Sequence, residues 1–452
     1  MTPLHTLSTL FLAAPALLGQ PLAGTSAPVA PAPSTGLGPG LGPGLSTVLG
    51  TELAAPELVA AHDDRSDLVI LNDGKEIECR VILEAEDYIL TTRGSKKKQY
   101  SREDIAEIHS VERSLSQLFE RYDALPSRGP AELAELALFC EQNELPSEAR
   151  NFWIQVLTQD PENEQAWNEL GGVYTKRRGW RLKVRGRFYT VEQLRERVSD
   201  WKHAMEIPTA HFLLKTDIEP ERALNIALNL ERAYMTYYEV VGEALALQVF
   251  DEVPEVHVFK DPKDYPTPRF QGDEAWFSRG ENTVFVNGAS PEVANAAVFK
   301  LTHALVLNSF RRTIGGNGSI APWTERALAE AFSYALRVED GVASWEFGRP
   351  IMEYFRLQAT DDKPLGMKRV ITAGYGAFNN GTDAQRYNAE CHTLMFFLLH
   401  AEEGRYRQGL AAYMRSSFKG QSAPTHLEKA LGVKIKDLEP QWNAFVEATA
   451  AQ

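Results

Sequence analysis

The sequence predicts a multidomain protein of the α+β class. The chain has 452 residues, which is enough for two or three domains. Short alternating apolar segments separated by turn residues occupy 67–110, helical periodicity follows, and strands and helices are mixed from 207 onward. We therefore expect a small β module at 65–112, a helical segment with a hairpin at 113–206, and a larger α+β domain at 207–452.

The N-terminus carries the pattern of an export signal. The run Leu7–Leu18 is apolar but too short to cross a bilayer, and small residues suited to cleavage follow at Ala23–Gly24. We expect residues 1–24 to be a cleaved signal peptide, and the Pro/Gly/Ala-rich residues 25–64 to be a disordered linker. The mature protein is then secreted or periplasmic, and no later apolar run is long enough to make it membrane-spanning.

Charge and cysteine content exclude several classes of function. The net charge of -14 gives no counterion-release gain on DNA or RNA, so we expect no nucleic-acid partner. The run Lys96–Lys98 lies beside Gly94 and is interpreted as an exposed turn. The three cysteines lack CxxC spacing, which argues against both a disulfide framework and a cysteine zinc site.

The segment 67–110 reads as a set of short strands. We expect strands at 67–71, 76–84, 87–92 and 105–108, with turns at Asn72–Lys75 and Arg93–Ser95. Strands this short and evenly spaced predict a small β-barrel, and the segment resembles modules of SH3 or Sm type.

A helical repeat pattern follows the strands. Trp167, Leu170, Gly171 and Tyr174 fit the W-x2-L-G-x2-Y signature, so residues 130–163 resemble one tetratricopeptide (TPR) repeat and 164–177 the first helix of another. One and a half repeats are too few for an independent solenoid. We interpret them as a spacer packed on its neighbours, with a peptide-binding groove as the alternative, and we expect a hairpin at 179–190.

The C-terminal half contains the most informative helix. We expect strands at 209–214, 255–259 and 283–287 and a long helix at 219–241. A second helix opens at Ser290–Glu292 with a good N-terminal cap and runs over 293–310. It is apolar nearly all round, which predicts burial, yet it carries Lys300 and His303. A further helix is expected to open at Pro322–Trp323.

These helices resemble those of the gluzincin metallopeptidases, in particular the peptidase MA-like group. Thr302–Leu305, Pro322–Trp323 and Leu328–Glu330 match the framework, and the resemblance spans about 207–446. In that family an HExxH helix provides two zinc-binding histidines and a glutamate general base. The first glutamate of the following helix provides the third ligand. The resemblance therefore implies a gluzincin-like fold for this domain.

The residues that would bind zinc do not carry over. Phe299 stands in place of the first histidine, Lys300 replaces the general base, and Arg326 replaces the third ligand, which leaves His303 alone. Catalytic zinc needs three protein ligands, so we expect no zinc or other cofactor and no catalytic residue. His303 is then a hydrogen-bonded core histidine, and the domain is a pseudoenzyme.

Lys300 needs a partner if its helix is buried. We hypothesise that it pairs with Glu325 or Glu330 and that Arg326 joins the same network. Lys300, His303, Glu325, Arg326 and Glu330 then form the binding residues of a vestigial cleft, whose cations favour an acidic ligand or a chain terminus.

The sequence thus predicts an exported, non-catalytic protein that binds a peptide or protein partner. One alternative is an active zinc metallopeptidase with a non-standard ligand set, in which Glu325 would take part. A second alternative is a structural envelope or assembly protein whose cleft is closed.

Overall fold

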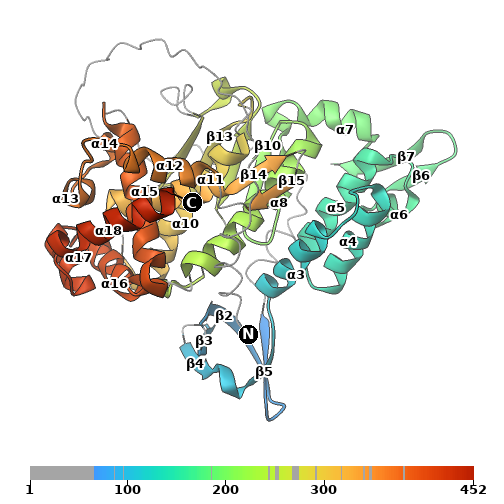
Figure 1. Cartoon of the computed structure of the whole chain (residues 1–452). Coiled ribbons are helices and arrows are strands. Elements are labelled where there is room, and N and C mark those ends of the chain that lie inside the picture. The colour runs from blue at the N-terminus through green and yellow to red at the C-terminus, as the bar shows by residue number, and fades with distance from the viewer. Residues whose placement is uncertain are drawn as a thin grey trace, which may run out of the picture. The chain divides into compact units, whose positions relative to one another are not determined.

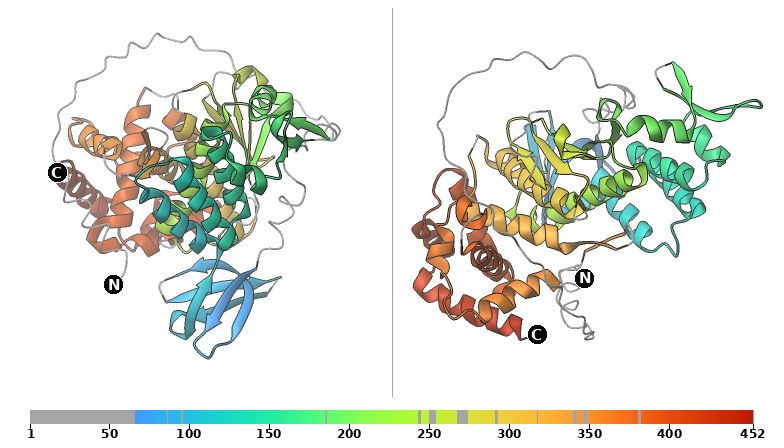
Figure 2. Two further views of the ribbon diagram at one scale, coloured as in Figure 1. Left: turned by 90° about the vertical axis from the view of Figure 1, so that its right-hand side faces the viewer. Right: turned by 90° about the horizontal axis from the view of Figure 1, so that it is seen from above.

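The computed structural model describes residues 66–451, with gaps at 86, 95, 185, 243–244, 250–253, 267–273, 291–292, 317, 340–341, 346–348 and 380–381. Within helices and strands, side chains are not described at 239–240, 294–295, 299, 330–339, 342–345 and 349–351. The predicted signal peptide and linker lie outside the described residues. What the structure describes is a mixed α+β protein with several separate sheets (Figures 1 and 2).

The first module is a five-stranded antiparallel sheet. Its strands, in the order β4-β3-β2-β1-β5, are β1 (Asp67–Leu71), β2 (Glu76–Glu84), β3 (Tyr88–Arg93), β4 (Lys96–Ser101) and β5 (Ile105–His109). The predictions for 67–71 and 76–84 are confirmed. The predicted barrel is wrong, because among the described strands β4 and β5 form two edges and do not pair.

The lysine run is a strand and not a turn. Lys96, Lys97 and Lys98 lie in β4, where their side chains are exposed. A strand at the edge of a sheet tolerates consecutive lysines because one flank is open to solvent, and such charges also discourage pairing with another chain. The turn that precedes the run is built on Gly94, whose φ of +60° suits glycine.

Helices follow the sheet directly. They are α3 (Val111–Asp123), α4 (Pro130–Gln142), α5 (Pro146–Gln159) and α6 (Glu164–Glu169). Helices α4 and α5 pack against each other, and the predicted repeat positions Leu136, Cys140 and Trp153 are buried between them. The prediction of a helix over 164–177 is wrong, since α6 ends at Glu169 and residues 173–175 form a strand. The assignment to the TPR family stays a prediction.

The helix α6 ends because two glycines turn the chain. Gly171 has a φ of +74°, and the N–H of Gly172 donates to the carbonyl oxygen of Trp167 at 2.6 Å. The chain passes so close to Trp167 that a Cβ on Gly172 would lie 2.6 Å from a ring carbon and 2.8 Å from the backbone oxygen.

Gly172→Ala is therefore expected to lower the free energy of unfolding by about 1–3 kcal/mol, because the backbone oxygen cannot move aside without shifting α6. Gly374→Ala is the matched control, since a Cβ there has nothing within 4 Å and a negligible change is expected. Urea unfolding of both variants measures the difference. Equal stability of the two variants would contradict the close approach.

A small three-stranded antiparallel sheet comes next, in which the hairpin predicted at 179–190 is joined by one further strand. It consists of β6 (Val173–Thr175), β7 (Gly179–Val184) and β8 (Arg187–Tyr189). Helix α7 (Val191–Val198) follows and opens with a capping box formed by Thr190 and Gln193. Figures 1 and 2 show β6 and β7 extending outward beyond α6.

The C-terminal domain is built on a second five-stranded sheet in the order β12-β13-β11-β10-β9. Its strands are β9 (Met205–Pro208), β10 (Leu213–Thr216), β11 (Glu255–Phe259), β12 (Ala275–Ser278) and β13 (Thr283–Asn287). The three central strands are parallel and the two edge strands are antiparallel. The predicted bounds of β11 and β13 are confirmed. The strand predicted at 209–214 is correct only for residues 213–214, which begin β10, while residues 209–212 form the turn between β9 and β10, closed by the hydrogen bond from Thr209 N–H to Phe212 O.

Three long helices position the candidate site beside this sheet. They are α8 (Pro220–Tyr237), which continues as a π-helical turn to Gly242, α10 (Val293–Ile314) and α11 (Pro322–Ala335). Helix α10 packs on α8, on β12 and β13, and on α11, and the described side chains on it are mostly buried, as its apolar sequence predicts. The chain reverses between α10 and α11 so that their side chains meet.

The rest of the domain is helical after the strand pair β14 (Leu336–Glu339) and β15 (Val342–Trp345). The helices are α12 (Arg349–Ala359), α13 (Met367–Ile371), α14 (Tyr375–Asn379), α15 (Ala384–His400), α16 (Arg407–Phe418), α17 (Pro424–Leu431) and α18 (Ile435–Ala450). Helix α15 packs on α11 and α12. In the described part of the chain, every helix is too short or too polar to pass through a membrane.

Candidate functional site

The candidate site lies where α10 faces α11. His303 of α10 and Glu325 of α11 meet across the two helices, with Nδ1 of the histidine 2.7 Å from Oε1 of the carboxylate. Glu325 is 3% exposed, so its charge is removed from water. A buried carboxylate without partners is costly, and this one is stable because several donors converge on it.

Two further residues complete the cluster around Glu325. Arg279 follows β12 and places Nη2 at 3.3 Å and 3.4 Å from the two carboxylate oxygens. Tyr375, the first residue of α14, donates its hydroxyl to Oε2 of Glu325 and accepts from Arg279 at 3.3 Å. We call His303, Glu325, Arg279 and Tyr375 the Glu325 cluster. Three separate segments of the domain are joined to α11 through one carboxylate.

The protonation states follow from burial and charge. Burial opposes ionisation of Glu325, but the hydrogen bonds from His303 and Tyr375 and the charge of Arg279 outweigh it and lower its pKa. Burial lowers the pKa of His303, and the charges of Lys300 and Arg326 lower it further against the opposing effect of Glu325. We therefore assign a neutral histidine whose Nδ1–H donates to an ionised carboxylate. The ionic partner of that carboxylate is Arg279.

Arg326 and Lys300 are the other predicted site residues whose side chains the structure describes. Arg326 lies beside Glu325 on α11, but it points to α14 and α15, where it donates to Asn379 and Asn388 at 3.4 Å and 3.1 Å. Lys300 is half-buried on α10, close enough to His303 to influence its pKa. The side chains of Phe299 and Glu330 lie outside the described residues. The hypothesis that Lys300 pairs with Glu325 or Glu330 stays a prediction.

The residues of the Glu325 cluster do not fit a zinc ion. His303 and Glu325 are ligand types that zinc uses, but they are hydrogen-bonded to each other, and Arg279 contacts both carboxylate oxygens. A cation in that position repels a divalent metal. Among the described residues, no three or more His, Cys, Asp or Glu side chains gather closely enough to hold a metal ion.

Sequence reasoning missed two members of this cluster. Arg279 lies 46 positions before Glu325, and Tyr375 lies 50 positions after it. Neither belongs to the motifs that define the helices. The available signal was chemical, because a buried glutamate needs a cation and hydrogen-bond donors from elsewhere in the chain.

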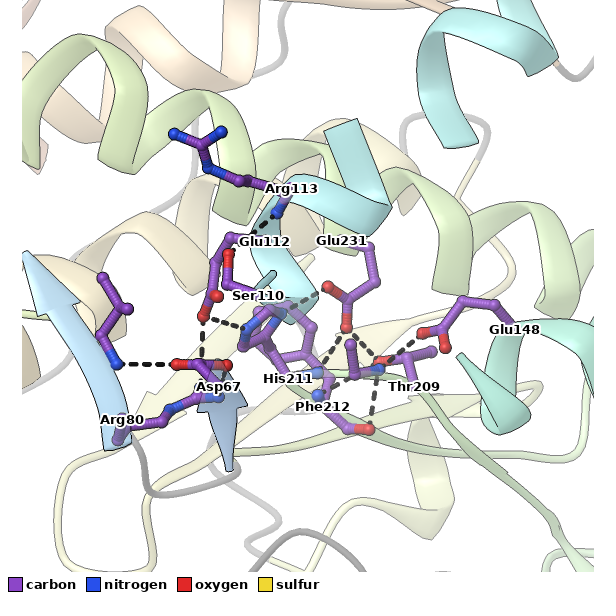
Figure 3. A network of polar contacts seen from close by, with 12 residues as sticks. Asp67, Arg80, Ser110, Glu112, Arg113, Glu148, Thr209, His211, Phe212 and Glu231 are labelled. Atoms are coloured by element: carbon purple, nitrogen blue, oxygen red, sulfur yellow. Dashed lines mark hydrogen bonds and ion pairs between the residues drawn. The ribbon is translucent and has the colours of Figure 1, made fainter. Parts of the chain in front are cut away.

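A second buried polar network also escaped prediction (Figure 3). His211 lies between two carboxylates, with Nδ1 at 2.8 Å from Glu231 of α8 and Nε2 at 3.5 Å from Glu112 of α3. Arg80 of β2 binds Glu112 at 3.2 Å and Asp67 at 3.5 Å. The network thus connects the first sheet, α3 and α8, and its position between elements indicates a structural role.

The charges of this network support one another. Burial alone would lower the pKa of His211, but the Glu231 and Glu112 carboxylates raise it to about 9. Burial would raise the pKa of Glu112, but Arg80 and His211 lower it to about 2. His211 is therefore protonated at neutral pH and bridges two ionised glutamates.

The structure defines a mixed α+β protein in which a buried, hydrogen-bonded carboxylate connects two helices of the C-terminal domain. No model of a known protein family matches the chain, and no curated protein matches it. The gluzincin resemblance therefore rests on the residues named above.

Proposed function

We propose that the C-terminal domain is a pseudopeptidase that holds a peptide or protein partner without cleaving it. The observation that carries this proposal is the Glu325 cluster. Arg279 neutralises the carboxylate of Glu325, and His303 donates its Nδ1–H to the same group, so neither His303 Nδ1 nor Glu325 is available to a metal ion. The cluster joins α10 to α11 through one buried carboxylate, and we take it as the counterpart of a metal site in this domain.

The polar groups at the cluster favour a carboxylate-bearing ligand. The Arg279 side chain is 44% exposed and Tyr375 is 39% exposed, so both have surface available beyond Glu325. Lys300 adds a half-buried positive charge nearby. Charged hydrogen bonds to a carboxylate are about twice as strong as neutral ones. A peptide C-terminus or an acidic side chain suits these groups.

The first part of the test measures bound zinc and peptide-bond cleavage. Purified full-length protein is expected to contain no stoichiometric zinc by atomic emission and to leave a quenched fluorescent casein substrate uncut after incubation with added zinc. One equivalent of zinc that is lost in His303→Ala, together with cleavage, would establish the alternative of an active metallopeptidase.

The second part measures binding with a defined probe. A pool of random-sequence synthetic octapeptides with free C-termini is compared with the same pool amidated, using fluorescence polarisation. The free-acid pool is expected to bind at least about tenfold more tightly, since one charge-assisted hydrogen bond contributes about 1.5–3 kcal/mol. Lys300→Gln is expected to reduce this difference, whereas Lys368→Gln, at an exposed position on α13, is not. Absence of zinc and of peptide binding would favour the structural alternative.

A further inference from the structure

The three-stranded sheet β6–β8 has two unlike faces. Residues directly opposite each other in the register point to the same side, so Tyr174, Trp180, Leu182 and Tyr189 share one face. The ring of Trp180 stacks on Trp167 at 6.0 Å, and Leu182 packs against the same helical core. This face attaches the sheet to the helices.

The opposite face is cationic and apolar. By the same register, Val173 lies opposite Arg181, and Lys183 lies opposite Phe188. Val173 and Phe188 are each 42% exposed, and the guanidinium of Arg181 lies 5.0 Å over the Phe188 ring. We call Val173, Arg181, Lys183 and Phe188 the hairpin face.

The turn between β6 and β7 extends the positive charge. Its residues Lys176, Arg177 and Arg178 are all exposed. In a chain of net charge -14, the segment 170–191 contains seven Lys and Arg residues and neither Asp nor Glu. Of the four large apolar side chains that are most exposed in the described part of the chain, Val173 and Phe188 lie on the hairpin face, and Tyr174 lies on the other face of the same sheet. Exposed apolar groups gathered among cations mark an interaction surface.

We infer that the hairpin face and its turn bind the surface of an anionic lipid bilayer. Lys and Arg are attracted by the negative surface potential, and exposed aromatic and aliphatic side chains enter the boundary between headgroups and acyl chains. The exposed aliphatic Val173 has no use in stacking on a base, which argues against a single-stranded nucleic acid.

Geometry and net charge favour a planar partner. Strands β6 and β7 extend outward beyond α6 (Figures 1 and 2). A bilayer surface can therefore contact these strands without contacting the rest of the chain. Salt screens charges over a distance of about 10 Å, so acidic residues farther from the bilayer than that repel it only weakly. The predicted export of the chain would place the sheet where it meets a membrane.

The test is sedimentation of the full chain with lipid vesicles at low salt. Vesicles of one part phosphatidylglycerol to two parts phosphatidylcholine are expected to bind the protein at least about tenfold better than phosphatidylcholine alone, and high salt is expected to weaken this binding. The N-terminal apolar run is present in every variant, so differences between variants report on the sheet.

Three variants separate the contributions. Replacing Lys176, Arg177 and Arg178 together by Gln is expected to lower the partition coefficient by about 100-fold, since each surface cation contributes roughly a fivefold gain. Phe188→Ser is expected to lower it by about tenfold through lost apolar burial. The matched control replaces Lys96, Lys97 and Lys98 by Gln, which removes the same charge from β4, and a change below about threefold is expected.

Three results would overturn the inference. These are equal losses in the two triple variants, no loss in Phe188→Ser, or tighter binding to a single-stranded oligonucleotide that displaces the vesicles. Circular dichroism of each variant shows whether the fold is kept. The outcome is independent of the zinc and peptide measurements, because the hairpin face shares no residue with the Glu325 cluster.

Discussion

Replacing His211 by leucine is expected to lower the free energy of unfolding by about 3–5 kcal/mol, the usual cost of breaking a buried ion pair from one side. Glu231 is fully buried and Glu112 lies beside the same imidazole. Without the imidazolium, both carboxylates lose a counter-charge that they cannot replace with water. Urea unfolding measures the loss.

Two comparisons show whether charge is the cause. His203→Asn alters a histidine whose side chain is 37% exposed, and a change within about 0.5 kcal/mol is expected there. The double variant His211→Leu/Glu231→Gln removes both charges and is expected to recover at least about half of the loss. Equal free energies of unfolding for the His211→Leu and His203→Asn variants would show that the charges around His211 contribute no net stability.

The pH dependence gives an independent readout of the same pairing. The pKa of His211 is raised from 6.5 to about 9, so its stabilisation is fully present below pH 6.5 and is lost as pH rises through about 9. The pKa of Glu112 is lowered from 4.5 to about 2, so its stabilisation is present above pH 4.5 and is lost as pH falls through about 2. Between pH 6.5 and 9 the difference in stability between the wild type and His211→Leu is therefore expected to shrink.

Replacing Glu325 by alanine is expected to lower the free energy of unfolding by about 2–4 kcal/mol. The carboxylate accepts from His303 and Tyr375 and pairs with Arg279, so its removal leaves three donors facing a cavity. The expected loss is smaller than that for His211 because the Arg279 side chain is 44% exposed and regains water.

The control for Glu325 is a glutamate in an exposed pair. Glu107→Ala removes the partner of His109 on β5, where both side chains are more than half exposed, and a change of less than about 1 kcal/mol is expected. Thermal unfolding with and without added zinc supplies the second measurement. A wild type that zinc stabilises strongly, and a Glu325→Ala variant that zinc no longer affects, would show that Glu325 is a metal ligand and that the Glu325 cluster is misassigned.

Local patterns in the sequence predicted several elements to the residue. The strands Asp67–Leu71, Glu76–Glu84, Glu255–Phe259 and Thr283–Asn287 follow from alternation and turn residues, which act over a few positions. The buried helix that carries His303 follows from an apolar sequence on all sides. The barrel prediction failed because a distant contact decides it, namely whether β4 and β5 pair. The second repeat helix failed for a local reason, since the two glycines at 171–172 turn the chain back on Trp167.

The sequence by itself determined the α+β class. The interpretation of Phe299, Lys300 and Arg326 as substituted metallopeptidase ligands beside His303 stays a prediction. Only the tertiary structure decided what His303 binds. Its partner Glu325 lies on the next helix, and Arg279 and Tyr375 reach that glutamate from segments about fifty residues away on either side. A buried carboxylate takes whichever donors the fold brings to it, and no short-range pattern in the chain specifies which donors those are.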